Sequence, residues 1–103
     1  MRLSMQTLRI LQLFAETPDE PRYGLEVMER TSLQSGTVYP ALHRLESNGW
    51  LLSREEEIDA SVAGRPARRL YHLTPTGLAG TLEALEPFRA VRRAPISAKA
   101  RLA

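Results

Sequence analysis

The sequence predicts one mainly helical α+β domain, in which a helix-turn-helix is followed by a two-stranded β-hairpin and a long last helix. Apolar residues recur at helical spacing in four stretches, whereas the stretch between Gly49 and Thr74 changes to strand-like alternation. A chain of 103 residues is long enough for one small hydrophobic core. Since a hairpin directly after the second helix of a helix-turn-helix is a wing, we expect a winged helix-turn-helix.

The composition is that of an ordinary globular protein with an uneven distribution of charge. Cysteine is absent, which excludes disulfides and thiolate metal sites. Neither a membrane span nor a signal peptide is recognised, so we expect a cytoplasmic protein without a membrane partner. The net charge is only +2, but Arg65, Arg68 and Arg69 lie in a segment that contains no acid. Such a segment favours contact with a polyanion over a merely solvated loop.

The first helix is expected to begin after a capping hydroxyl at Ser4 and to end near Glu16. Its apolar residues, including Leu3, Leu8 and Leu11, cover two sides of the helix rather than one stripe. A helix that is apolar on two sides either lies at the centre of its own domain or is shared with a second subunit.

A second, shorter helix is predicted roughly from Tyr23 to Thr31, after a proline-containing loop. Leu25, Val27 and Met28 are expected to point inward. A brief polar turn then leads to a third helix over residues 35–48, and this arrangement is typical of a helix-turn-helix.

The third helix has an apolar stripe on one side and an unusual polar face on the other. This face carries hydroxyls, a tyrosine and basic groups, which can donate hydrogen bonds to phosphates and base edges. The candidate DNA-binding residues on this helix are Ser35, Gly36, Thr37, Tyr39, Pro40, His43 and Arg44. Structural alternatives stay open: Tyr39 can pack against the turn, His43 can be an ordinary surface residue, and Ser35 and Gly36 can simply start the helix.

The wing is predicted from two strands, residues 50–57 and 68–73, joined by a loop over residues 58–67. In the second strand Tyr71 and Leu73 are expected on the core face. The run of acids from Glu55 to Glu57 is expected to face water. The arginines of the loop and second strand would then contact the DNA backbone or the minor groove.

A last helix is expected to begin at Thr74 and Pro75, a capping hydroxyl followed by proline at the first helical position. Its apolar residues form a seam that is too long for its own small domain to cover, so we predict a homodimer; the alternative is packing within one chain. The expected interface residues are Leu3, Leu8, Leu11, Leu78, Leu82, Leu85, Phe88 and Val91. We therefore divide the chain into a winged helix-turn-helix domain (residues 1–73) and a dimerisation helix with a short basic tail (residues 74–103). Pro87 is expected to kink the helix or to start a new segment.

Four groups of residues, in order and spacing, resemble the PadR family of transcriptional regulators. These are Tyr23-Gly24, residues 36–46, Gly49-Trp50-Leu51 and residues 64–77, and the resemblance covers about residues 8–82. It implies a short-form member that binds a palindromic operator as a homodimer through its first and last helices, most often to repress transcription. It also implies that Thr37 and Tyr39 lie near the DNA backbone and that Arg65 and Arg68 belong to the wing.

Some members of this family respond to phenolic acids or planar drugs, which leaves a small aromatic effector in the dimer cleft as an open question. The drug-binding relatives use a tryptophan on the last helix, whereas the single tryptophan here, Trp50, starts the wing.

No enzyme, metal or cofactor is expected, because the chain lacks a glycine-rich phosphate loop, metal-ligand spacing and a paired nucleophile and base. The serious alternative to a sequence-specific DNA-binding regulator is a winged helix for protein contact or anti-repression, without an operator of its own. We predict the first, with helix 35–48 in the major groove and the 53–72 wing on the backbone or minor groove. A gel shift separates the two.

Overall fold

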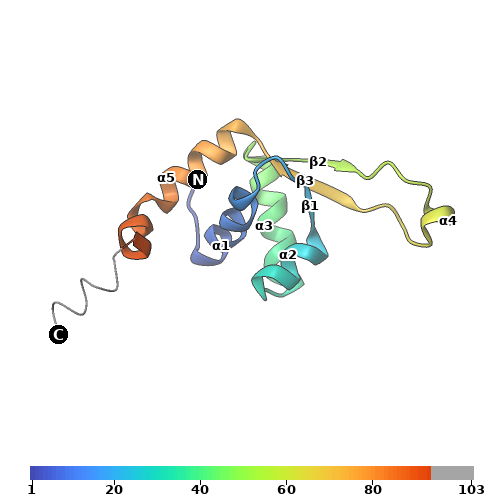
Figure 1. Cartoon of the computed structure of the whole chain (residues 1–103), viewed down its shortest axis with the longest axis horizontal. Coiled ribbons are helices and arrows are strands. Elements are labelled where there is room, and N and C mark those ends of the chain that lie inside the picture. Colours follow the sequence, from blue (N-terminus) through green and yellow to red (C-terminus); the bar gives the residue numbers. More distant parts are fainter. Residues whose placement is uncertain (94–103) are drawn as a thin grey trace.

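The structure, a computed structural model, describes residues 1–93 of the chain and the side chains of residues 1–89. Three helices form the body, a hairpin projects from it, and a long helix follows the hairpin (Figure 1). The helices are α1 (Met5–Glu16), α2 (Gly24–Thr31), α3 (Ser35–Ser47), α4 (Ala60–Ala63) and α5 (Pro75–Arg93). The strands are β1 (Arg22–Tyr23), β2 (Leu51–Glu55) and β3 (Arg69–Leu73). The predicted tail from Ser97 onward and the side chain of Val91 lie outside the described residues.

The predicted starts of α1 and α5 are confirmed by their capping contacts. The hydroxyl of Ser4 accepts a hydrogen bond from the Thr7 amide at 3.0 Å, and the hydroxyl of Thr74 accepts one from the Gly77 amide at 2.9 Å. Gly49, two residues after α3, has a φ of 76°, a conformation that suits glycine. The last helix runs through Pro87 without a break, so no new segment begins there.

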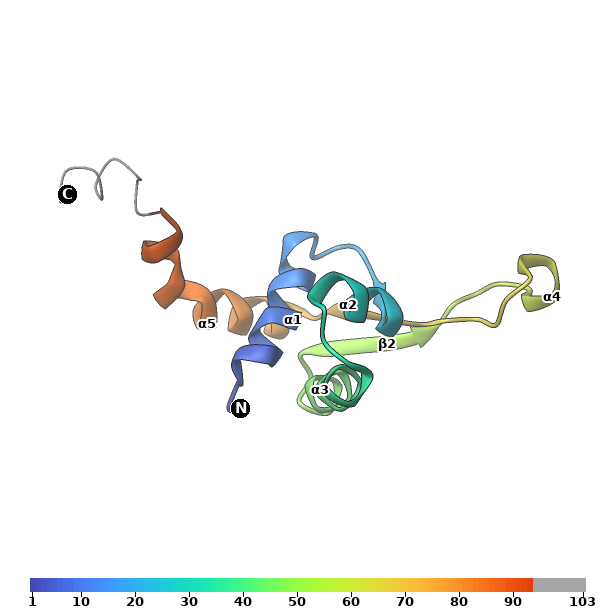
Figure 2. The same cartoon turned by 90° about the horizontal axis from the view of Figure 1, so that it is seen from below.

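The sheet has three strands rather than the two that were predicted. Its order is β1-β3-β2 with both pairs antiparallel; Arg22 lies opposite Tyr71, and Leu51 lies opposite Leu73. The two-residue strand β1 is too short to show any periodicity in the sequence. The predicted wing loop also contains the one-turn helix α4, which lies at the far end of the hairpin, away from the helical body (Figure 2).

The core lies between α1, α2, α3 and the inner face of the sheet. Its fully buried side chains are Ile10, Leu11, Phe14, Val27, Val38, Leu42, Leu45 and Leu51. As predicted, Leu73 is buried and Tyr71 packs against the core. The prediction for Leu25 is wrong, since this residue is 52% exposed. It lies two positions before buried Val27, and two positions turn a helix by about 200°.

Trp50, which connects α3 to β2, also fixes the start of α5. Its carbonyl accepts a hydrogen bond from the Thr74 amide at 3.0 Å. A Cβ atom on Gly77 would lie 2.1 Å from that carbonyl oxygen, and a Cβ atom on Gly80 would lie 2.4 Å from the indole ring. These two glycines therefore let the first turns of α5 lie directly on Trp50.

Among residues 1–93 there is no helix long and apolar enough to cross a membrane. The same residues contain no group of three side chains that could hold a metal ion.

Candidate nucleic-acid interface

A pocket of about 360 Å³ lies where α3 meets the base of the wing. It is lined by Tyr23, Gly24, Leu25, Tyr39, Arg65, Pro66, Ala67, Arg68, Arg69 and Tyr71. Four of the ten predicted DNA-binding residues meet here: Tyr39 from α3 and the three wing arginines. Since the pocket presents guanidinium groups beside phenol rings, its chemistry suits a phosphate or another anion.

The ring of Tyr39 lies directly on Gly24. A Cβ atom on Gly24 would come within 2.4 Å of the Tyr39 ring and within 2.6 Å of its hydroxyl oxygen. At the same time Tyr39 is 47% exposed. The packing alternative and the binding role are thus compatible, because the glycine holds the ring in place while much of its surface stays open.

The three arginines of the pocket lie in different environments. The guanidinium of Arg68 lies over the ring of Tyr23, 4.1 Å from the ring centroid, which is a cation–π contact. Arg65 forms a bidentate salt bridge with Glu56, with N–O distances of 2.7 and 3.2 Å. Arg69 is exposed at the start of β3. Tyr23, which the sequence alone does not select, thus contacts one of the candidate arginines through its ring.

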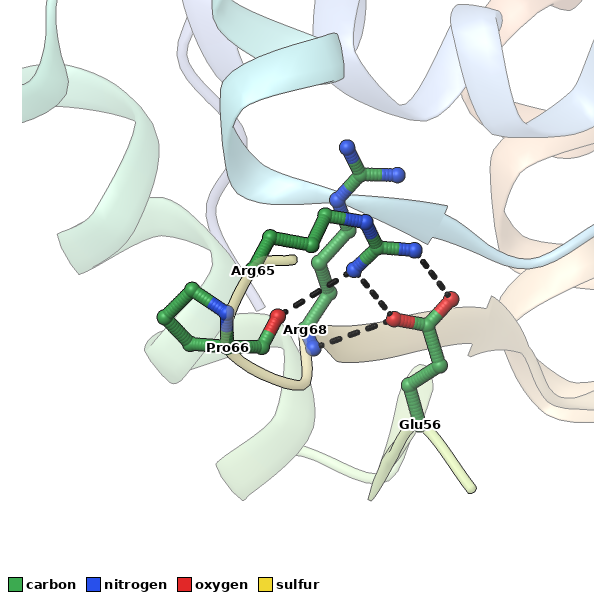
Figure 3. A network of polar contacts seen from close by, with 4 residues as sticks. All are labelled: Glu56, Arg65, Pro66 and Arg68. Carbon is green, nitrogen blue, oxygen red and sulfur yellow. Dashed lines mark hydrogen bonds and ion pairs between the residues drawn. The ribbon is translucent and has the colours of Figure 1, made fainter. Parts of the chain in front are cut away.

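Glu56 does not simply face water, as the sequence suggested. Besides the Arg65 guanidinium, its carboxylate accepts a hydrogen bond from the Arg68 amide at 3.3 Å (Figure 3). The hydrogen bond from Arg65 lowers the pKa of Glu56 below its ordinary value, so this acid stays ionised at neutral pH. The arginine segment contains no acid in the sequence, but the hairpin brings Glu56 to it from the opposite arm, one residue beyond β2.

A hydrogen bond also connects strand β2 of the wing to helix α3. The hydroxyl of Ser53 on β2 donates a hydrogen bond to the Glu46 carboxylate on α3, at 2.5 Å. Burial, together with the negative charge of Glu46, raises the pKa of the neighbouring Tyr71 phenol, which therefore stays protonated at neutral pH. These contacts fix the base of the wing relative to α3.

The other candidate residues of α3 lie outside the pocket. Ser35, Gly36, Pro40, His43 and Arg44 are exposed, and Thr37 is partly buried. Gln34, at the start of the helix, makes no capping hydrogen bond with its side chain. The first turn of α3 therefore keeps amides available for an anion.

A second concave surface of about 540 Å³ lies between α1 and α5. Its lining residues are Met5, Leu8, Arg9, Gln12, Leu82, Leu85, Glu86, Phe88 and Arg89, which include four of the predicted interface residues. Leu3 and Leu78 pack partly against the core. The prediction for Leu11 is wrong, because this side chain is fully buried within the chain and offers no surface for a contact with a second chain. The inner of the two apolar sides of α1 is covered by its own domain.

A helix-turn-helix with a basic wing beside its second helix defines a winged-helix DNA-binding regulator. The chain belongs to the transcriptional regulator PadR-like family, whose model matches residues 10–82. This confirms the resemblance seen in the sequence. The family consists of transcriptional regulators and not of enzymes, in agreement with the sequence analysis.

Individual relatives agree with this assignment. The transcriptional regulator Rv3488 of Mycobacterium tuberculosis is 42% identical over 67 residues, which are 65% of this chain and 52% of that protein. The chain thus matches about half the length of this relative.

Solved structures show the same fold. A PadR-like transcription factor from Bacteroides fragilis has a TM-score of 0.68 at 23% identity, covering 87% of this chain and 85% of that one. A PadR family regulator from Clostridium difficile R20291 has a TM-score of 0.70 at 22% identity, covering 88% and 94%.

Proposed function

We propose that the protein is a homodimeric repressor that reads a palindromic operator, with α3 in the major groove and the base of the wing on the DNA backbone or minor groove. The observation that supports this most directly is the pocket in which Tyr39 and three arginines meet from two separate elements. In this proposal the pocket receives a phosphate, and the exposed face of α3 reads the neighbouring base edges.

The proposal of a homodimer rests on the limited specificity of a single DNA-binding module, called here a reading head (α3 and the wing of one subunit). A single small module buries little DNA surface and reads few bases, whereas two heads on a two-fold axis read half-sites about one helical turn apart or a multiple of it. The groove between α1 and α5 supplies a surface for this pairing. It carries exposed apolar side chains, among them Leu82 at 54% and Phe88 at 38% exposure.

Replacing Arg68 and Arg69 together with alanine is expected to weaken binding to specific and random duplexes alike. Each lost phosphate contact should make the log–log dependence of affinity on salt shallower by about one unit. Fluorescence anisotropy with a labelled duplex, measured across a salt series, gives both the affinity and its dependence on salt. Genomic fragments selected by the purified protein supply the specific duplex.

The matched control replaces Arg2 and Arg30, two exposed arginines outside the pocket, with alanine. It removes the same charge and should leave the salt dependence nearly unchanged. If both double variants bind DNA with the affinity and salt dependence of the original protein, Arg68 and Arg69 of the wing have no part in DNA binding. If the original protein binds no duplex at low salt, a winged helix for protein contact becomes the better explanation.

Gly24→Ala is expected to reduce DNA affinity by about fivefold with little change in stability, since the loss of one good polar contact is worth roughly 1 kcal/mol. The new methyl group would displace the Tyr39 ring, which is half exposed and can swing away at little cost. Anisotropy and a thermal melt of the same sample measure the two effects.

A double-mutant cycle provides the control for this prediction. If Gly24→Ala acts through the tyrosine, it should cause no further loss of affinity in a Tyr39→Ala background. Additive losses would show that the glycine matters for another reason, such as the path of α2.

A further inference from the structure

Glu56 and Arg65 face each other across the base of the wing, at the rim of the proposed phosphate pocket. The carboxylate accepts hydrogen bonds from both terminal nitrogens of the guanidinium, and the Arg65 side chain also donates to the Pro66 carbonyl at 3.2 Å (Figure 3). The side chains of Arg65 and Glu56 keep 33% and 20% of their surface exposed, so solvent or a ligand can reach the pair. A guanidinium binds a phosphate with the same bidentate geometry.

The charge of the pocket depends on this pair. Arg68 and Arg69 form no ion pair with any acid in the described part of the chain, so their charges are free to act on DNA. Arg65 is neutralised by Glu56, which leaves the pocket with two uncompensated cations out of three. Its third cation becomes available only when the carboxylate releases it.

We propose that Glu56 is an internal substitute for a DNA phosphate, which holds Arg65 on non-specific DNA and yields it to a phosphate on the operator. This inference rests on the proposed function above. On random DNA the wing is not fixed in one register, so phosphates lie near Arg65 but none is aligned well enough to displace the carboxylate. On the operator the base contacts of α3 fix the register and align a phosphate with Arg65. Because ion pairs at an accessible surface contribute little to stability, giving up the contact with Glu56 costs little free energy. Glu56 thereby acts as a specificity-determining residue.

The test is Glu56→Gln, which keeps the shape and one acceptor oxygen but removes the charge. On random duplex this variant should bind about threefold to tenfold more tightly at low salt, with a salt slope steeper by about one unit, because Arg65 gains a phosphate contact. On a selected operator the slope should stay unchanged, since that contact already exists. The ratio of specific to non-specific affinity should therefore fall.

Glu57→Gln is the matched control, because Glu57 is the exposed neighbour of Glu56 and forms no ion pair with another described residue. It changes the net charge by the same amount without releasing Arg65. If the two glutamine variants bind random duplex equally, the inference is overturned while the proposed function stands. If the original protein binds no duplex at all, the proposed function fails and this inference fails with it.

A second variant keeps the test decisive if Glu56→Gln lowers the melting temperature. Arg65→Gln should weaken operator binding, with a salt slope shallower by about one unit, and should weaken random-duplex binding less, because there it only leaves the Glu56 charge uncompensated. An equal loss of affinity for the operator and for random duplex would show that Arg65 never leaves Glu56.

Discussion

Leu82→Glu is expected to turn the protein into monomers and to lower operator affinity by at least about a hundredfold, since linking two binding heads commonly raises affinity by that factor or more. Leu82 is more than half exposed on α5 and lines the groove with α1. If a second subunit covers this groove, the substitution places an unpaired carboxylate in an apolar interface, which strongly disfavours association. Sedimentation velocity at micromolar concentration measures the assembly, and anisotropy with the selected operator measures the affinity.

Leu52→Glu is the control for assembly, because Leu52 is also a leucine with almost the same exposure, 53% compared with 54%. It lies on β2, away from the groove, so this variant should remain a dimer. If Leu82→Glu also sediments as a dimer, the groove between α1 and α5 is not the subunit interface. The pairing of the two reading heads would then need another surface.

The elements that the sequence predicted well are those governed by local chemistry. Capping hydroxyls at Ser4 and Thr74 and the glycine after α3 mark helix ends through contacts within a few residues. Alternation in the second wing strand placed Leu73 and Tyr71 on the core side, because strand geometry alone decides which side chains share a face. These features need no knowledge of the rest of the chain.

The features that the sequence did not predict depend on contacts between distant residues. Strand β1 exists only because β3 pairs with it, and two residues carry no pattern of their own. Similarly, the neutralisation of Arg65 by Glu56 depends on the hairpin register, which places an acid of one arm beside the cations of the other. A count of charges along the sequence therefore overestimated the free positive charge of the wing.

In the candidate DNA site, too, some residues could be predicted from local features of the sequence, whereas others depend on contacts in the folded chain. Residue type and spacing selected Tyr39 and the wing arginines, and the structure brings these four together in one pocket. The part played by Tyr23 and Gly24 could not be derived from composition, because one lies under a guanidinium and the other under a phenol ring only in the folded chain.

Gly77→Ala is expected to destabilise the fold by about 2–3 kcal/mol, which is typical of overpacking a tight contact. Helix propensity alone predicts the opposite, a gain of about 1 kcal/mol when alanine replaces glycine within a helix. The packing effect should dominate, because the new methyl carbon would lie 2.1 Å from the Trp50 carbonyl oxygen, a backbone atom that cannot swing aside. A fall in melting temperature of roughly 10 °C or more is expected for a domain of this size.

Gly36→Ala separates propensity from packing, because Gly36 also lies in the first turn of a helix but a Cβ atom there meets nothing within 4 Å. This variant should be as stable as the original protein or more stable by up to about 1 kcal/mol. The folded fraction of Gly77→Ala should also bind the operator poorly although its Tyr39 and arginines are unchanged, because a shifted α5 would alter the spacing of two paired heads. If Gly77→Ala instead melts at a higher temperature, α5 does not rest on Trp50, and the proposed spacing of the heads loses its structural basis.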